Sequence, residues 1–320
     1  MTAGRSCPLA YRYRPEVLCT EPETLDVDVL YIIGGLYGNP YALDEIERMG
    51  REEERQGRSV ALVFNGDFNW FNASNSLFRN INERVLKHTV SLGNVDYELA
   101  NPSEGAGCGC AYPDFVDQGV VDRSNIIMKR LQGIAAEHPD IQDQLNALPR
   151  YRCLLFGGLK ILVLHGDPES LAGWGLAHEA FANGNESELK DWFSRAGADV
   201  IACTHTCLPV IWSGEVGGRQ RIVANNGSAG MGNLKSDPRG LITRIARDND
   251  NGASLARTGW SVESGDLCVS LRPVEFNIQG WLKEFDGLWP AGSAASESYC
   301  TRLLTGTFLK NNDLFFPRHS

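Results

Sequence analysis

The stretch Ala61-Leu62-Val63-Phe64-Asn65-Gly66-Asp67 decides the fold. It opens with four apolar residues rich in β-formers, and the charged run 51–58 precedes it. This pattern is typical of a buried parallel strand. Ligands bind at the carboxyl ends of such strands. A glycine there lets another group approach the backbone closely, and an aspartate offers a hard anionic oxygen. A single aspartate after a strand is more often a turn former, so its partners at other strand ends decide the matter.

Composition narrows the class of protein. A length of 320 residues allows one large α/β domain or two small ones. The net charge of -10 argues against nucleic acid or an anionic membrane surface as the main partner, whereas metal ions would let the site accept a phosphorylated small molecule. No apolar run reaches the roughly 18 residues of a membrane span, and residues 1–25 lack the apolar core of a secretory signal. Nine scattered cysteines indicate reduced thiols, so we expect a cytoplasmic location.

The chain order predicts its organisation. Residues 1–26 have no periodicity and are interpreted as an irregular N-terminal arm, followed by one domain over 27–320. A strand over 28–33, a glycine-rich turn, a helix over 41–55 and the Asp67 strand form a βαβ unit. Residues 101–119 are rich in Gly, Pro and Cys, which is typical of an insertion loop at an active site. Paired strands predominate after residue 152.

Polar residues follow four of the predicted strands. They are Asp67, Asn94, His165 and His205. One carboxylate, one amide oxygen and two imidazoles suit a divalent transition metal such as Mn, Fe or Zn. Each has a structural alternative, Asn94 as a turn former and the histidines as buried hydrogen-bonding groups. Because carboxyl ends of parallel strands lie along one edge of a sheet, we expect the four side chains to converge on one metal.

The order of these motifs resembles that of the calcineurin-like metallophosphoesterases, in particular the small bacterial phosphodiesterase type. The resemblance covers about 30–306 and implies an α/β fold of four layers, with a central β-sandwich of two mixed sheets flanked by helices. It also implies that Gly38 and Asn39 lie in a turn facing the ligand. The matching segments are 35–39, 66–67, 93–96, 165–166, 204–209 and 225–228.

The departures from the family pattern affect one of its two metal sites. The resemblance implies that the first site would use positions 35, 37 and 207 together with Asp67, and this chain has Gly35, Tyr37 and Cys207 there. All four positions of the second site are retained. A register that places Cys203 on the first histidine would instead remove one ligand from each site, but Thr206 and the Leu208-Pro209 step favour the first register.

The acid that protonates the leaving group in the family is also missing. Val95 stands at that histidine position, while Asp96, which would orient the histidine, remains. General acid help typically contributes about 10²–10⁴-fold. We therefore treat Asp96, Tyr37 and Cys207 as candidate catalytic residues, with the alternative that Tyr37 and Cys207 only fill the space of lost ligands.

Three functions remain open at this stage. The first is a single-metal hydrolase acting on a phosphoester or a related small molecule. The second is a non-catalytic binding or regulatory protein with the same fold. The third is a different small-molecule reaction, suggested by Cys108-Gly109-Cys110, for which a glycine-rich surface loop with two incidental thiols is the simpler interpretation. The oligomeric state does not follow from the sequence.

Overall fold

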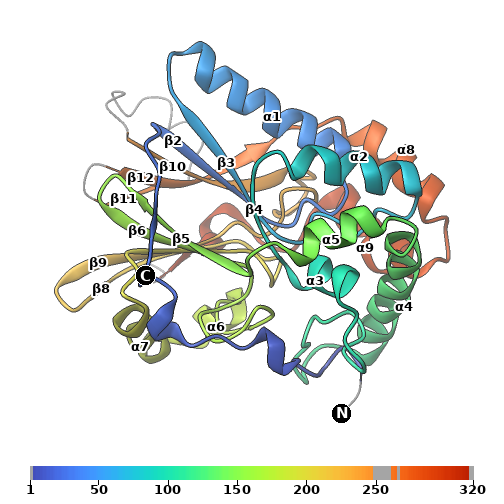
Figure 1. Ribbon diagram of the computed structural model, residues 1–320, viewed down its shortest axis with the longest axis horizontal. Coiled ribbons are helices and arrows are strands. Elements are labelled where there is room, and N and C mark those ends of the chain that lie inside the picture. Colours follow the sequence, from blue (N-terminus) through green and yellow to red (C-terminus); the bar gives the residue numbers. More distant parts are fainter. Residues whose placement is uncertain (1–2, 248–260, 265–266, 317–320) are drawn as a thin grey trace.

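Two mixed β-sheets pack face to face in the computed structural model, which describes residues 3–247, 261–264 and 267–316 (Figure 1). Within these residues one sheet has six strands in the order β11-β12-β10-β2-β3-β4. Their bounds are β2 Val29–Ile33, β3 Val60–Asn65, β4 Thr89–Ser91, β10 Gly240–Arg247, β11 Ser261–Ser264 and β12 Leu267–Val274. The other has seven described strands in the order β1-β5-β6-β7-β9-β8-β13. These are β1 Glu23–Thr24, β5 Tyr151–Phe156, β6 Leu159–Leu164, β7 Val200–Cys203, β8 Val210–Val216, β9 Arg219–Asn225 and β13 Phe315–Phe316.

Helices cover the outer faces of both sheets (Figure 1). The six-stranded sheet packs against α1 Pro40–Arg55, α2 Asn75–Val85, α4 Gln118–Ala135, α8 Ile278–Leu288 and α9 Ala294–Thr305. The seven-stranded sheet packs against α6 His178–Ala182, α7 Glu186–Ala196 and the N-terminal residues. The remaining helices are α3 Asn94–Ala100 and α5 Pro139–Asn146, with 3₁₀ turns at η1 Leu9–Tyr11, η2 Pro15–Val17 and η3 Asn311–Leu314. The predicted four-layer α/β fold is confirmed.

Strand periodicity explains the layers. Successive side chains of a strand point to opposite faces. In β2, Leu30 and Ile32 face the second sheet, while Val29, Tyr31 and Ile33 face the helices. Strands β6 and β7 alternate in the same way between the inner core and the helices of the other face. Both faces of these strands are therefore apolar, as the continuous apolar runs predict.

The predicted βαβ unit is present. Strand β2 pairs in parallel with β3, with Val29 opposite Val60, and α1 connects them. Pro40 is the first residue of α1, where its missing amide hydrogen costs nothing. Three helices were not predicted: α3, which starts at Asn94, the five-residue α6, and α9 near the end of the described chain.

The predicted arm is less irregular than expected. It contains η1, η2 and β1, and β1 pairs in parallel with β5. Residues 101–117 form turns, and α4 begins at Gln118, inside the predicted 101–119 loop. We propose that residues 27–316 form one domain; positions 1–2 and 317–320 of the predicted arm and domain lie outside the described residues, as do 248–260 and 265–266. No helix within the described ranges is long and apolar enough to cross a membrane.

Candidate functional site

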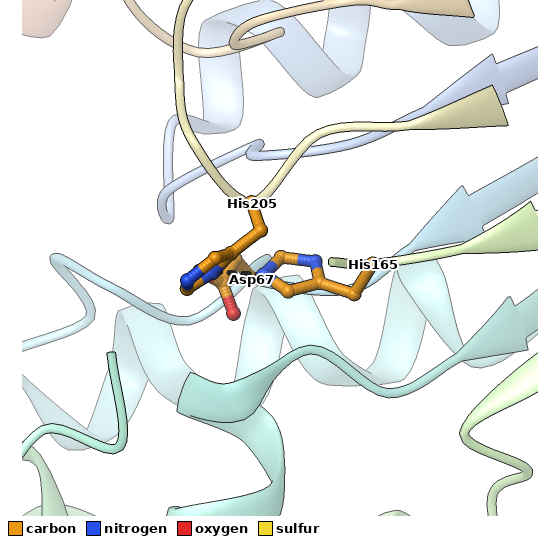
Figure 2. A group of neighbouring side chains, drawn as sticks. All are labelled: Asp67, His165 and His205. Carbon is orange, nitrogen blue, oxygen red and sulfur yellow. Dashed lines mark ion pairs between the residues drawn. The ribbon is translucent and has the colours of Figure 1, made fainter. Parts of the chain in front are cut away.

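The candidate ligands come from the ends of four strands in both sheets. Asp67 and Asn94 follow β3 and β4 of the six-stranded sheet, whereas His165 and His205 follow β6 and β7 of the other. The expectation of a single sheet edge was therefore wrong, because the site lies where the ends of two facing sheets meet. Asp67, His165 and His205 nevertheless form a buried group whose potential ligand atoms all lie within 4.8 Å of one another (Figure 2).

Two glycines allow the first sheet to present these groups. A Cβ on Gly66, whose φ is +77°, would lie 2.1 Å from the backbone nitrogen of Gly93. A Cβ on Gly93 would lie 2.2 Å from Asp67 Oδ1 and 2.9 Å from His165 Cε1. Any larger residue at either position would force the ends of β3 and β4 apart. These glycines thus set the distance between the two strand ends.

His165 is oriented so that one ring nitrogen faces only acceptors. Its Nδ1 lies 3.0 Å from the carbonyl oxygen of Asn65, so this nitrogen carries a hydrogen and donates it. Its Nε2 faces Asn94 Oδ1 at 3.2 Å and Asp67 Oδ2 at 3.3 Å. The amide of Asn94 is held in this orientation because its Nδ2 donates to the carbonyl oxygen of Cys108 at 3.1 Å. A lone pair on Nε2 would repel both oxygens, so this point needs either a proton or a cation.

His205 has one ring nitrogen with a free lone pair. Its Nε2 donates to the carbonyl oxygen of Cys110 at 3.1 Å, and its Nδ1 is buried without a hydrogen-bond partner among the described residues. Burial, reinforced by the nearby His165, lowers the pKa of His205 to about 3, so the ring is neutral. A neutral imidazole with an unused nitrogen is the form that binds a metal. The two histidines and Asp67 therefore fit a divalent metal.

The Asp67 carboxylate is held as an anion. Burial alone would raise its pKa, but the charges of His165 and His205 and the hydrogen bonds from His165 and Val95 together outweigh burial, and the pKa of Asp67 is lowered. Burial lowers the pKa of His165 as well, and Asp67 more than offsets this, so that the pKa is raised. Oδ1 of Asp67 also accepts from the backbone nitrogen of Val95 at 3.0 Å.

Asp96 lies behind Asp67 rather than in the cavity. One of its oxygens accepts from the Asp67 backbone nitrogen at 2.6 Å, and the other accepts from Asn69 at 3.0 Å. Burial, with the nearby charge of Asp67, raises the pKa of Asp96 to about 7. Asp96 does not contact the cavity. We propose that it positions Asp67; direct participation in catalysis stays a prediction.

The positions of the family's other metal site are filled by a phenol and a thiol. Tyr37 Oη lies 2.7 Å from Cys207 Sγ. The Tyr37 ring covers Gly35, where a Cβ would lie 3.0 Å from two ring carbons. Tyr37, Asp67 and Cys207 all have positive φ, between 52° and 61°, which is unusual for residues with side chains and is concentrated at functional sites. Burial raises the pKa values of both Tyr37 and Cys207, so both groups are protonated at neutral pH.

A cavity of about 170 Å³ opens onto Asp67 and His205. Val95, Cys110 and Thr206, which line it beside Tyr37 and Cys207, belong to segments that the sequence analysis identified. Five further lining residues were not predicted from the sequence: Trp70, Tyr112, Trp174, Tyr299 and Arg302. Some signals existed: Trp70 closely follows Asp67, and the composition of 101–119 is that of an active-site loop. Arg302 and Tyr299 belong to α9, whose only sequence signals were its capping Ser293 and the terminal Gly306.

The interpretation of Cys108-Gly109-Cys110 as a surface loop was wrong. Cys108 is fully buried and Cys110 is 8% exposed. The carbonyl oxygens of the two cysteines accept hydrogen bonds from Asn94 and His205, respectively. The insertion loop therefore orients two of the candidate ligands through its backbone.

Gly38 and Asn39 form the predicted tight turn without lining the cavity. Gly38 has a φ of +70°, and a Cβ there would lie 2.0 Å from Asn72 Oδ1. Asn39 caps α1 by accepting from Ala42, and its Nδ2 donates to the carbonyl oxygen of Gly230. Gly38 and Asn39 therefore form the N-terminus of α1. Ligand binding by these two residues stays a prediction.

Comparisons with known proteins agree with this fold. The sequence matches no protein-family model and no curated protein. A metallophosphoesterase from Sphaerobacter thermophilus superposes with a TM-score of 0.54 at 17% identity, covering 88% of this chain and 100% of that chain. A hypothetical protein from Pyrococcus horikoshii OT3 gives a TM-score of 0.56 at 14% identity, with 88% and 99% covered. At these identities the likeness establishes the fold, and the chain has the fold of the calcineurin-like metallophosphoesterases.

Proposed function

We propose that this protein is a hydrolase of small phosphoesters that uses one divalent metal. Asp67, Asn94, His165 and His205 would hold the metal. The observation that carries the proposal is the buried group of Asp67, His165 and His205, whose potential ligand atoms all lie within 4.8 Å of one another, with Asn94 Oδ1 3.2 Å from His165 Nε2 and with Nδ1 of His205 unpartnered among the described residues. Burying such groups without a compensating cation or proton is costly.

A bound divalent metal lowers the pKa of a coordinated water and polarises an ester oxygen. The chain's own residues hold the ligands still for this purpose. Asn65 fixes the tautomer of His165, and the 101–119 loop fixes Asn94 and His205. Such support from outside the ligand set typically matters 10–100-fold for metal affinity or activity.

In this proposal Tyr37 can bind substrate, and Cys207 does not act as a nucleophile. Cys207 is a buried thiol at neutral pH, and its Sγ lies 3.3 Å from the carbonyl oxygen of His205, so it is a poor nucleophile. The Tyr37 hydroxyl is close to Cys207 and to the cavity, where it can donate a hydrogen bond to a substrate oxygen. Neither replaces the missing acid at Val95.

The test is metal content per chain together with turnover. Protein purified without chelators is analysed by inductively coupled plasma mass spectrometry, and hydrolysis of 4-nitrophenyl phosphate and its bis-ester is followed with added Mn²⁺, Fe²⁺ or Zn²⁺. We expect close to one metal per chain and slow, metal-dependent hydrolysis. Both should be lost in Asp67→Ala, His165→Ala. The matched control is His88→Ala, since His88 packs on Phe64 away from the site.

Close to two metals per chain would contradict the single-site proposal. A second candidate function, a non-catalytic binding protein, is favoured by Val95 and by the Tyr37–Cys207 contact in the other half of the site. Bound metal without hydrolysis of any phosphoester, or absence of metal after soaking, would support that alternative and refute the proposed hydrolase.

A further inference from the structure

Arg302 places a fixed positive charge at the cavity. Its Nε donates to the carbonyl oxygen of Gly232 at 2.9 Å, and its Nη2 donates to that of Cys207 at 2.5 Å. These two bonds hold the guanidinium plane against the wall of the cavity that contains Cys207 and Tyr37. A guanidinium keeps its charge at any accessible pH, so this wall is cationic.

Among the described residues, this charge has no anionic partner. Arg302 forms no ion pair with a carboxylate anywhere in the described part of the chain, and its Nη1 forms no hydrogen bond to a described residue. Many other arginines are ion-paired, for example Arg84 with Asp44 and Glu47. A half-buried guanidinium that is held by carbonyl oxygens and faces a cavity is suited to bind an anion that enters it.

The aromatic side chains that line the rest of the cavity are suited to contact an aromatic ring of a ligand. Trp70 and Tyr299 contact each other edge to face with ring centroids 6.4 Å apart, and Tyr112 and Trp174 lie 5.8 Å apart. All four line the cavity. An apolar cavity of about 150 Å³ is large enough to bind benzene. A cavity of about 170 Å³ therefore has space for one aromatic ring.

The absence of a general acid at position 95 also favours an aromatic ring, as the leaving group of the substrate. Val95 cannot protonate a departing oxygen, so an ester with a stabilised leaving group has a large advantage. A phenol has a pKa near 10, like the tyrosine side chain, and leaves readily as phenolate. In the hydrolysis, the oxygen of water forms a bond to phosphorus and gives one proton to solvent, the bond between phosphorus and the aryl oxygen breaks, and the phenolate takes one proton from solvent.

We infer that Arg302 binds the phosphoryl group of an aryl phosphoester whose single ring lies among Trp70, Tyr112, Trp174 and Tyr299. This inference rests on the proposed function for its reaction, but anion binding by Arg302 can be measured without turnover. In this inference, Arg302 of α9 supplies the positive charge near the phosphoryl group that a second metal would supply.

The experiment is a binding titration with phenylphosphonate, whose P–C bond is not an ester and is not hydrolysed. Binding is followed by tryptophan fluorescence, because Trp70 and Trp174 line the cavity, and by calorimetry, on metal-free and Mn²⁺-loaded protein. We expect Arg302→Met to weaken binding by about tenfold or more, since a charge-assisted hydrogen bond is lost. The matched control is Arg123→Met. Arg123 donates to Ser298 of α9, the helix that also carries Arg302, but Arg123 does not line the cavity.

Ligand comparisons in the wild type keep the inference testable if Arg302→Met does not fold. Phenylphosphonate should bind at least tenfold more tightly than benzyl alcohol, which lacks the charge, and more tightly than inorganic phosphate, which lacks the ring. Equal affinity for benzyl alcohol would refute the anion site, and equal affinity for phosphate would refute the ring site. Unchanged affinity in a folded Arg302→Met variant would also refute the inference.

The outcomes separate this inference from the proposed function. If Arg302→Met weakens phenylphosphonate binding to a protein that holds no metal and has no activity, the anion site stands and the hydrolase is refuted. If the wild type binds metal and hydrolyses phosphoesters while Arg302→Met binds phenylphosphonate normally, the hydrolase stands and the anion site is refuted.

Discussion

The substitution Gly35→Ala tests whether the Tyr37 ring occupies the space of the missing metal site. A Cβ at position 35 would lie 3.0 Å from Cε2 and Cζ of Tyr37 and 3.2 Å from its Oη. Gly35 also has a φ of +64°, where a side chain costs about 1–2 kcal/mol. Overpacking against the ring adds about 1–3 kcal/mol. We therefore expect Gly35→Ala to lower the free energy of unfolding by about 2–5 kcal/mol.

Gly197 provides the matched control, because its φ is +65° and a Cβ there would have nothing within 4 Å. Gly197→Ala should cost only the backbone part, about 1–2 kcal/mol. In a Tyr37→Ala background, Gly35→Ala should fall to the same value. The measurement is urea unfolding of all variants as a double-mutant cycle. If Gly35→Ala costs as much without the Tyr37 ring as with it, the ring does not fill this space and our account of the lost site is wrong.

Other parts of the structure lead to three further predictions. Burial raises the pKa of Glu53, but its ion pair with Arg244 outweighs burial and lowers the pKa. The stability that this ion pair contributes is therefore complete above the ordinary glutamate pKa of about 4.3, and it is lost as pH falls through the lower pKa of the folded state. Glu53→Gln should cost about 3–5 kcal/mol at pH 7 and flatten the acid limb of stability against pH in urea unfolding, and an unchanged limb would contradict this. Gly93→Ala should abolish metal binding in mass spectrometry because its Cβ would collide with Asp67, whereas Gly133→Ala, in an open helical position, should bind metal normally and gain about 1 kcal/mol. Finally, the rate of hydrolysis should fall steeply as the leaving-group pKa rises across a series of aryl and alkyl phosphates, and Val95→His should reduce that slope; equal slopes would argue against position 95 as the site of the missing acid.

The sequence predicted the candidate ligands better than the reason for their proximity. Residues that follow apolar strands were identifiable one by one, and in the structure His205 lies near Asp67 and His165, and Cys207 contacts Tyr37. Strand-end reasoning assumed one sheet, however, and the ligands are divided between two. Which strands share a sheet depends on long-range pairing, such as β10 with β2, and local patterns contain no signal for that pairing.

The cavity walls were harder to predict for two physical reasons. Helix α9 buries only Ala295 and Leu303 fully, so its sequence lacks the continuous apolar stripe that reveals most helices. The position of the 101–117 turns depends on tertiary contacts such as the bond from Asn94 to the Cys108 carbonyl oxygen. A loop rich in glycine and cysteine has the same composition whether it lies on the surface or against a metal ligand.

The half of the site that contains Tyr37 and Cys207 is packed rather than open. Loss of ligands at random would leave open, polar space, but here the ring of Tyr37 covers Gly35 and its hydroxyl contacts Cys207. The carbonyl oxygen of that same Cys207 accepts a hydrogen bond from Arg302, so Cys207 also fixes the guanidinium charge at the cavity. Under the proposed function, an anion entering the cavity would meet both the metal held by Asp67, Asn94, His165 and His205 and the Arg302 guanidinium of α9. Since Arg302 cannot activate water, this arrangement should retain substrate binding better than it retains rate, which is why binding and turnover must be measured separately.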